Sequence, residues 1–269
     1  MRIKIIHETR YQYEQSPLHL VQRLHLKPVD FASQKVLHWK ITAPGMGGAL
    51  EYVDGFGNWV HLVTTQKPEQ DLVIRAEGEV DTQDTAGVVR GLIAQVPDNV
   101  FLRQGPSTRP DAAMLKALAP LREGRNSLAI GHGLMELVHS KIAYEVGTSD
   151  AHTTAAESFA AGRGVCQDHA QVMIGMAREL GIPARYVTGY LVTGVGASAA
   201  AAHAWAELLV PDLGWVGFDA ANDQCPTEHY VRLASGLDAA AIAPIKGSRR
   251  GGVGAEHLTV AVSAEIEQQ

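Results

Sequence analysis

The chain has 269 residues, of which 46% are hydrophobic and 19% charged, and its formal net charge is −6 at pH 7. These values are typical of soluble globular proteins, and they exclude disordered and collagen-like chains. Basic residues are scattered, apart from Lys246, Arg249 and Arg250 beside a glycine cluster, so we expect no nucleic-acid partner. The length allows one large domain or two medium ones, and we expect two.

The start of the chain alternates apolar with polar or charged residues and contains no unbroken apolar segment. It resembles neither a secretory signal nor a membrane anchor, so we expect a cytoplasmic protein with no membrane partner. A reducing compartment would keep the two cysteines, Cys166 and Cys225, as free thiols. Each cysteine then serves catalysis, metal binding or plain burial.

Residues 1–84 are predicted to form an all-β, sandwich-like domain. Short stretches there alternate apolar with polar residues, or are rich in β-branched and aromatic ones, and Pro, Gly and Asp separate them. Several strands without an intervening helix favour an antiparallel sandwich. The expected strands are 2–14, 18–28, 34–43, 49–53, 58–66 and 71–82.

Residues 85–269 are predicted to form a second, α+β domain. Apolar residues recur at helical spacing over 127–143 and again from Cys166 to about residue 180, where Gly181 and Pro183 end the helix. A low-complexity run at 194–202 is expected to be a mobile loop next to the site. The other expected elements are a short helix near 112–119, strands at 184–192, 203–210 and 215–220, a short helix at 227–235, a surface loop at 236–254 and a closing strand at 257–266.

The most informative motif is the segment GRGVCQDH at 162–169. Its small residues form a turn that places Cys166 on the first turn of a predicted helix. The free N–H groups and the positive end of the dipole at a helix N-terminus favour a negative charge on sulfur. The sequence therefore predicts that Cys166 is a nucleophile.

A cysteine nucleophile needs a base, and the base needs an acceptor that orients it. His203 and Asp219 can supply both, because they flank a predicted hairpin with a turn at 211–214. If Leu209 pairs with Trp215, which leaves an odd loop, His203 and Asp219 share one face and lie diagonally opposite. An even, four-residue loop would place them on opposite faces.

Beside GVCQDHA at 164–170, three further segments are informative: LGIPARYVTGY at 180–190, HAWAE at 203–207 and GWVGFD at 214–219. With these segments the chain resembles the transglutaminase-like superfamily, and within it a bacterial branch described as cysteine proteases, which has a β-rich N-terminal domain. The likeness is most specific over 125–225. It implies a papain-like core, with a nucleophile helix against an antiparallel sheet, in which Cys166, His203 and Asp219 are the nucleophile, the base and the orienting acid.

The sequence departs from the family pattern at two places. Ala220 and Ala221 follow Asp219, where the family usually has Pro-Thr, and Ala160 stands about where papain-type enzymes carry an oxyanion-hole glutamine. The backbone N–H of Cys166 is one expected oxyanion donor. Tyr144 and Gln167 are both candidates for the second donor.

Other residue types carry weaker signals. His169 lies three positions after Cys166, as in a metal pair on one helix face, but no CxxC or HxxxH set accompanies it. No ordered acidic loop for calcium is present either, so we expect no metal and no cofactor. Cys225 is expected to be a passive buried thiol. Trp205 and Trp215 are expected to be structural aromatics, and either one could wall the substrate groove.

The expected activity is cysteine-dependent acyl transfer on peptide-like amides through a thioester, with a peptide or protein as substrate. Water as the acceptor gives a protease or amidase, which we prefer, and an amine gives a protein-glutamine transglutaminase. A non-catalytic protein-interaction module is a further alternative, because a fold does not guarantee its chemistry. The sequence leaves the oligomeric state open.

Overall fold

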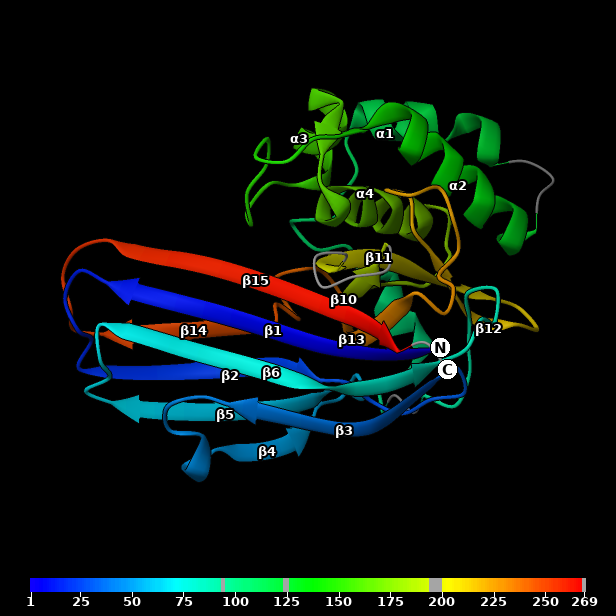
Figure 1. Ribbon diagram of the computed structural model, residues 1–269. Helices are drawn as coiled ribbons and strands as arrows, with labels where there is room; N and C mark the ends of the chain where they lie inside the picture. Colours follow the sequence, from blue (N-terminus) through cyan, green and yellow to red (C-terminus); the bar gives the residue numbers. More distant parts are fainter. Residues whose placement is uncertain (93–94, 123–125, 194–199, 268–269) are drawn as a thin grey trace.

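The computed structural model describes residues 1–92, 95–122, 126–193 and 200–267. A long β part lies against a part that contains all the α-helices, and the two ends of the chain lie close together (Figure 1). Within the described ranges, no helix is both long enough and apolar enough to cross a membrane. Most of the expected loop at 194–202 lies outside the described residues.

Two four-stranded antiparallel sheets form the β part, which we call the sandwich. One sheet has the order β15-β1-β6-β3 and the other β14-β2-β5-β4. Alternate residues of β1 and β6 are buried, as the sequence pattern predicts, and residues such as Tyr11, Leu24 and Ile74 fill the space between the sheets. The strand bounds are Arg2–Tyr13 (β1), His19–Lys27 (β2), Gln34–Thr42 (β3), Leu50–Val53 (β4), Trp59–Gln66 (β5) and Asp71–Thr82 (β6).

The end of the chain returns to the sandwich. Strand β15 (Glu256–Glu267) pairs with β1 along its whole length, and β14 (Ile245–Arg250) pairs with β2. The division into 1–84 and 85–269 therefore needs a correction, because the last two strands complete the sheets that the first strands begin. Residues 236–254, expected to be a surface loop, contain β14.

The second layer is a five-stranded antiparallel sheet of order β13-β10-β11-β12-β7, which we call the core sheet. The segment 227–235, expected to be a helix, instead contributes the strand β13. Every residue of β10 and β13 is buried, because both faces of the core sheet are covered. The bounds are Val88–Val89 (β7), Ala184–Val192 (β10), Ala200–Val210 (β11), Gly214–Phe218 (β12) and Tyr230–Gly236 (β13).

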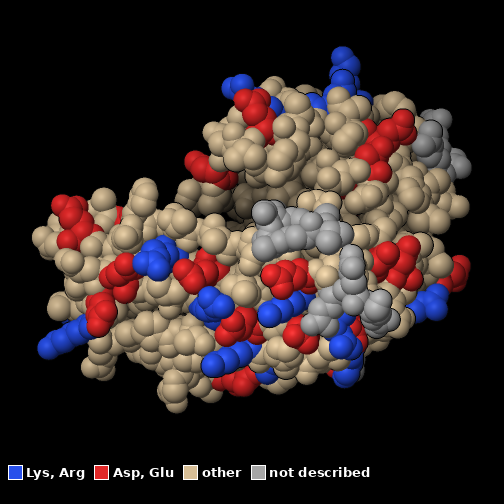
Figure 2. Space-filling model, viewed as in Figure 1, with Lys and Arg blue, Asp and Glu red and all other residues tan. Residues whose placement is uncertain are grey.

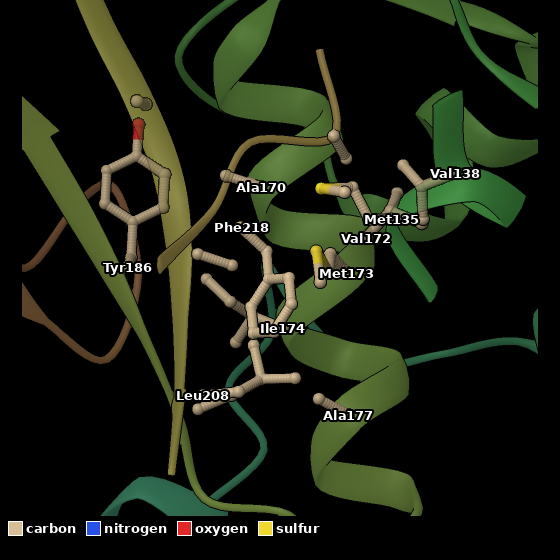
Figure 3. Packing of buried hydrophobic residues seen from close by; sticks show 14 of the residues in the cluster. Met135, Val138, Ala170, Val172, Met173, Ile174, Ala177, Tyr186, Leu208 and Phe218 are labelled. Carbon is tan, nitrogen blue, oxygen red and sulfur yellow. The ribbon is translucent and has the colours of Figure 1, made fainter. Parts of the chain in front are cut away.

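Helix α4 (Cys166–Glu179) packs against β10 and β11 of the core sheet. Figure 3 shows Met173 and Ala177 of α4 in the same buried cluster as Phe218 and Leu208 of the sheet. This packing fixes the axis of α4 and so the place of its first residue. The other helical and short elements are η1 (Met46–Gly48), η2 (Asp98–Leu102), α1 (Ala112–Ala117), η3 (Ala119–Leu121), α2 (Ser127–Lys141), β8 (Ala143–Tyr144), α3 (Ala155–Ala161) and β9 (Arg163–Gly164).

Polar side chains join the sandwich to the core sheet at β13. The Gln34 carboxamide donates to the carbonyl of Arg232 at 2.9 Å and accepts from its N–H at 2.8 Å. Asn58 makes the same pair of bonds with the backbone of Ser235, each 2.8 Å long. All four residues are buried, so these bonds satisfy backbone groups that a strand at the edge of a sheet would leave unpaired.

Candidate active site

A tight turn holds the start of α4. Gly162 has a φ of 66°, a left-handed conformation that glycine adopts without cost, and it ends α3. A Cβ at Gly164 would lie 2.6 Å from the carboxylate of Asp168, so only glycine fits there. That carboxylate is fully buried and accepts hydrogen bonds from the Val165 N–H at 2.7 Å and the Ser149 hydroxyl at 2.5 Å. Asp168 thus fixes the chain just before Cys166.

Cys166 is the first residue of α4 and is half-buried. Its side chain lies close enough to the His203 imidazole to raise the pKa of that ring. The two residues are 37 positions apart in sequence, and α4 and β11 bring them together by packing side by side. The sulfur therefore lies at the N-terminus of helix α4 and beside an imidazole.

The hairpin of β11 and β12 has the register that the sequence predicts. Leu209 pairs with Trp215 and Val210 with Gly214, which leaves an odd loop of three residues. His203 and Asp219 consequently share one face, and His203 Nε2 lies 2.6 Å from Asp219 Oδ2. Because Nε2 is bonded to the carboxylate, Nδ1 is the ring nitrogen that serves the sulfur of Cys166.

Two residues that sequence reasoning missed complete the surroundings of Asp219. The Tyr230 hydroxyl and the Asn222 carboxamide each donate to Asp219 Oδ2 at 2.7 Å. The Gln224 carboxamide in turn donates to the Tyr230 hydroxyl at 2.7 Å. Asn222 was detectable as a turn-forming residue three positions after the acid, whereas Tyr230 comes from β13 and no local pattern connects it to the site.

These contacts set the charges of the pair. Burial lowers the pKa of His203, but its hydrogen bonds to Asp219 and Cys166 and their negative charges outweigh burial and raise the pKa to about 10. Burial raises the pKa of Asp219, but hydrogen bonds from His203, Asn222 and Tyr230 outweigh it, so the pKa lies below its ordinary value. At neutral pH the site holds an imidazolium between two groups that favour its positive charge.

The turn after Asp219 is held by hydrogen bonds in place of the family's proline. The Ala221 N–H donates to Asp219 Oδ1 at 3.1 Å, and Asp219 and Gln224 form an isolated bridge through their backbones. Asp223, inside the turn, has a φ of 51°, a conformation that Asp tolerates better than most residues. The departure from the family pattern therefore leaves the acid firmly placed.

Aromatic rings enclose the histidine. Trp205, two residues along β11, stacks on the His203 ring at a centroid distance of 6.3 Å, and Tyr230 lies 5.9 Å from the same ring. Both side chains are buried, so they exclude water from the back of the imidazole and hold its orientation. Trp215 instead packs under the guanidinium of Arg185 at 4.1 Å. Of the two tryptophans, Trp205 is the one that backs the histidine.

The remaining candidate residues have structural surroundings. Both ring nitrogens of His169 lie 2.9 Å from backbone carbonyls, those of Val165 and Ile142, which leaves neither nitrogen for a metal. Among the described residues, no group of three His, Cys, Asp or Glu side chains is arranged to hold a metal ion. Cys225 is half-buried beside Gly87, and burial and the charge of Asp84 raise its pKa.

Both candidates for the second oxyanion donor lie near Cys166. Tyr144 pairs with Gly164 in the short parallel ladder of β8 and β9, and its pKa is raised by burial and by the charges of Cys166 and Asp219. Gln167 follows Cys166 directly on the first turn of α4, and its carboxamide is 3.5 Å from the carbonyl of Asp150. The sequence alone does not show where either side chain lies relative to Cys166.

Two family models match the chain. Residues 122–220, which hold all three candidate catalytic residues, match the transglutaminase-like superfamily, and residues 3–81 match the bacterial transglutaminase-like N-terminal region. These two stretches of the chain are therefore similar to transglutaminase-like proteins. The α+β architecture predicted from the sequence, with a β-rich N-terminal part and a helix packed on an antiparallel sheet, is confirmed.

Relatives of similar length occur in mycobacteria. An uncharacterized protein of Mycobacterium leprae is 27% identical over 97% of each chain, and one of Mycobacterium tuberculosis is 26% identical over 91% of this chain and 87% of the relative. A crystal structure from Cytophaga hutchinsonii, described as a "putative cysteine protease", superposes with a TM-score of 0.77 at 22% identity and covers 100% of this chain and 92% of its own. This likeness shows that the two chains share a fold.

Proposed function

We propose that the protein catalyses acyl transfer from peptide-like amides through a thioester on Cys166, with water as the acceptor. One observation carries the proposal: His203 is hydrogen-bonded to Asp219 at 2.6 Å, and both Asp219 and Cys166 lie close enough to the imidazole to raise its pKa. The sulfur and the protonated imidazole thus supply a nucleophile and a proton donor side by side.

The chemistry follows from that contact. The Cys166 sulfur attacks the amide carbon, a C–S bond forms, and negative charge develops on the carbonyl oxygen. The N–H groups at the start of α4 can stabilise this charge. His203 Nδ1 then donates its proton to the leaving nitrogen, the C–N bond breaks, and the amine departs from a thioester.

Deacylation reverses the roles. His203, now neutral, accepts a proton from water, and the resulting hydroxide oxygen attacks the thioester carbon. The C–S bond breaks, a carboxylic acid leaves, and the sulfur regains the imidazolium as its partner. Asp219 remains ionised throughout and orients the ring.

Water is the preferred acceptor because the nucleophile is open to it. Cys166 is half-buried, and the surface is hollowed between the helical part and the sandwich (Figure 2). An enzyme that transfers the acyl group to an amine must keep water away from its thioester. The proposal also includes a peptide or protein substrate and a cytoplasmic enzyme, in keeping with two free cysteines.

The test is a screen of the purified full chain on a mixed peptide library, with and without an added primary amine, read by mass spectrometry. We expect shortened peptides or free acids that the Cys166→Ser variant does not produce. A product dominated by amine adducts would assign the enzyme as a transferase. The absence of any Cys166-dependent product would favour the non-catalytic interaction module.

A further inference from the structure

A pocket of about 260 Å³ lies next to the first turn of α4. Gln167, the residue after Cys166, lines one side, and Tyr186 and Thr188 of β10 line another. The segment from Ala239 to Pro244 closes it, and Lys246 of β14 stands at its rim. The pocket thus lies where the helical part, the core sheet and the sandwich meet, and sequence reasoning did not identify it.

The pocket serves the acyl side of the cleaved bond. The leaving nitrogen must face His203 to receive its proton. Neither Cys166 nor His203 lines the pocket itself, but Gln167, the next residue after the cysteine, does. Tyr186, whose pKa the charge of Cys166 raises, is also part of the wall, so the pocket lies on the side of the substrate that becomes the thioester.

Its walls are mainly apolar. Ala151, Ala239, Ala240, Ile242, Ala243 and Pro244 line it together with one imidazole, that of His152, and none of the described lining residues is acidic. The one ammonium group, on Lys246, is exposed and already donates to the Ala240 carbonyl at 3.1 Å. Sites for whole small molecules have volumes of roughly 300–1,000 Å³. The smaller size here suits one large side chain.

One polar group points to a ligand inside the pocket. Tyr186 is only 4% exposed, and its hydroxyl forms no hydrogen bond with the described part of the chain, although the residue lines the pocket. The hydroxyl is not one of the fully buried, unpartnered polar atoms of the described residues, so it reaches the open space of the pocket, where a ligand or water can accept its hydrogen bond. Burial and then the charge of Cys166 raise its pKa well above the ordinary value, so the hydroxyl keeps its proton and can donate.

We propose that this pocket selects an uncharged, apolar side chain on the acyl donor, with the Tyr186 hydroxyl donating a hydrogen bond to the substrate backbone. The inference rests on the proposed function, since it uses Cys166 as the nucleophile. The substrate class is then a peptide with a large apolar residue, such as Leu or Phe, next to the cleaved amide.

The test uses the full chain and four peptidyl chloromethyl ketones that carry Leu, Phe, Glu or Lys next to the reactive group. The rate of Cys166 alkylation is measured by mass spectrometry and divided by the rate with iodoacetamide, which has no side chain to place. We expect the Leu and Phe probes to react at least about 10-fold faster than the Glu and Lys probes.

Variants separate the pocket from the nucleophile. Ala240→Phe fills the pocket from an exposed position, and we expect it to lower the relative rates of the Leu and Phe probes about 10-fold. Ala113→Phe, a matched change at an exposed alanine of α1, should leave them unchanged. Tyr186→Phe removes only the hydroxyl, and we expect about a 10-fold loss for the same two probes.

The outcomes are distinguishable. The pocket assignment would be overturned if the four probes react at equal relative rates, or if neither Ala240→Phe nor Tyr186→Phe changes those rates. In either case, faster iodoacetamide labelling of Cys166 than of Cys225 would still support Cys166 as the nucleophile. If iodoacetamide labels Cys166 no faster than Cys225, the nucleophile itself is misassigned, and the proposed function fails with the inference.

Discussion

The imidazole of His203, on strand β11, and the carboxylate of Asp219, directly after strand β12, are joined by a 2.6 Å hydrogen bond although they lie 16 positions apart. The odd loop of the hairpin makes this contact, because shifting the register by one residue would turn one of the two side chains to the opposite face. The bond uses Nε2 and so leaves Nδ1 for Cys166. Every prediction about the chemistry depends on this orientation.

Asp219→Asn should keep the fold and lower kcat by at least about 100-fold, because a neutral carboxamide neither favours the imidazolium nor holds the same tautomer. The measurement is kcat on the best substrate from the library, together with the melting temperature. Asp223→Asn, in the same turn and exposed, is the matched control and should retain activity. An unchanged kcat for Asp219→Asn would show that another group orients His203.

Tyr230→Phe should move the acidic limb of the pH–rate profile to higher pH. The Tyr230 hydroxyl is one of the donors that hold the pKa of Asp219 down, so removing it raises that pKa, and the carboxylate is protonated at a higher pH. We expect about a 10-fold lower kcat on the acidic side. Tyr52→Phe in β4 is the control. A loss of the same size at every pH would indicate a packing role instead.

Cys166→Ser and His203→Ala should each lower kcat by about 1,000-fold or more, and the double variant should lose little beyond either single one. The reason is that the sulfur and the imidazole act as one unit. Kinetics of the four proteins on one substrate check this, with Cys225→Ser as an active control. Losses that multiply in the double variant would mean that the two residues work independently.

Removing residues 245–269 should destabilise the sandwich, because it takes away β14 and β15 and exposes the edges of β1 and β2. We expect a lower melting temperature, measured by scanning calorimetry, and aggregation, detected by size-exclusion chromatography. A variant that ends at residue 267 keeps the whole of β15 and serves as the control. A monomeric truncated protein with an unchanged melting temperature would contradict the role of these strands.

Much of the fold is readable from the sequence, because many of its elements keep a clear period. The alternation over 71–82 predicts β6 to the residue, and the spacing of apolar residues predicts α4 to within one residue of its end. The diagonal contact of His203 and Asp219 follows from parity alone. These features depend on neighbours along the chain or across one hairpin.

The elements that the sequence does not predict depend on distant partners. All seven residues of β13 are buried, so the strand has no alternation and was read as a helix. Strand β14 is largely exposed and carries Lys246, Arg249 and Arg250, a composition that suits an edge strand but resembles a loop. Tyr230 reaches Asp219 only because β13 lies beside β10, which no local pattern indicates.

The most direct test of the central claim is the pH dependence of iodoacetamide labelling of Cys166 in the wild-type protein and in His203→Ala, with Cys225 as the internal reference. The pKa of His203 is raised to about 10, so the imidazolium persists beside the sulfur from pH 5.5 to 8.5. We expect the wild-type rate at Cys166 to change by less than about 3-fold over this range, and the rate in His203→Ala to fall steeply toward low pH, as it does for Cys225. The same steep fall at Cys166 in both proteins would show that no ion pair with His203 exists and would contradict the account.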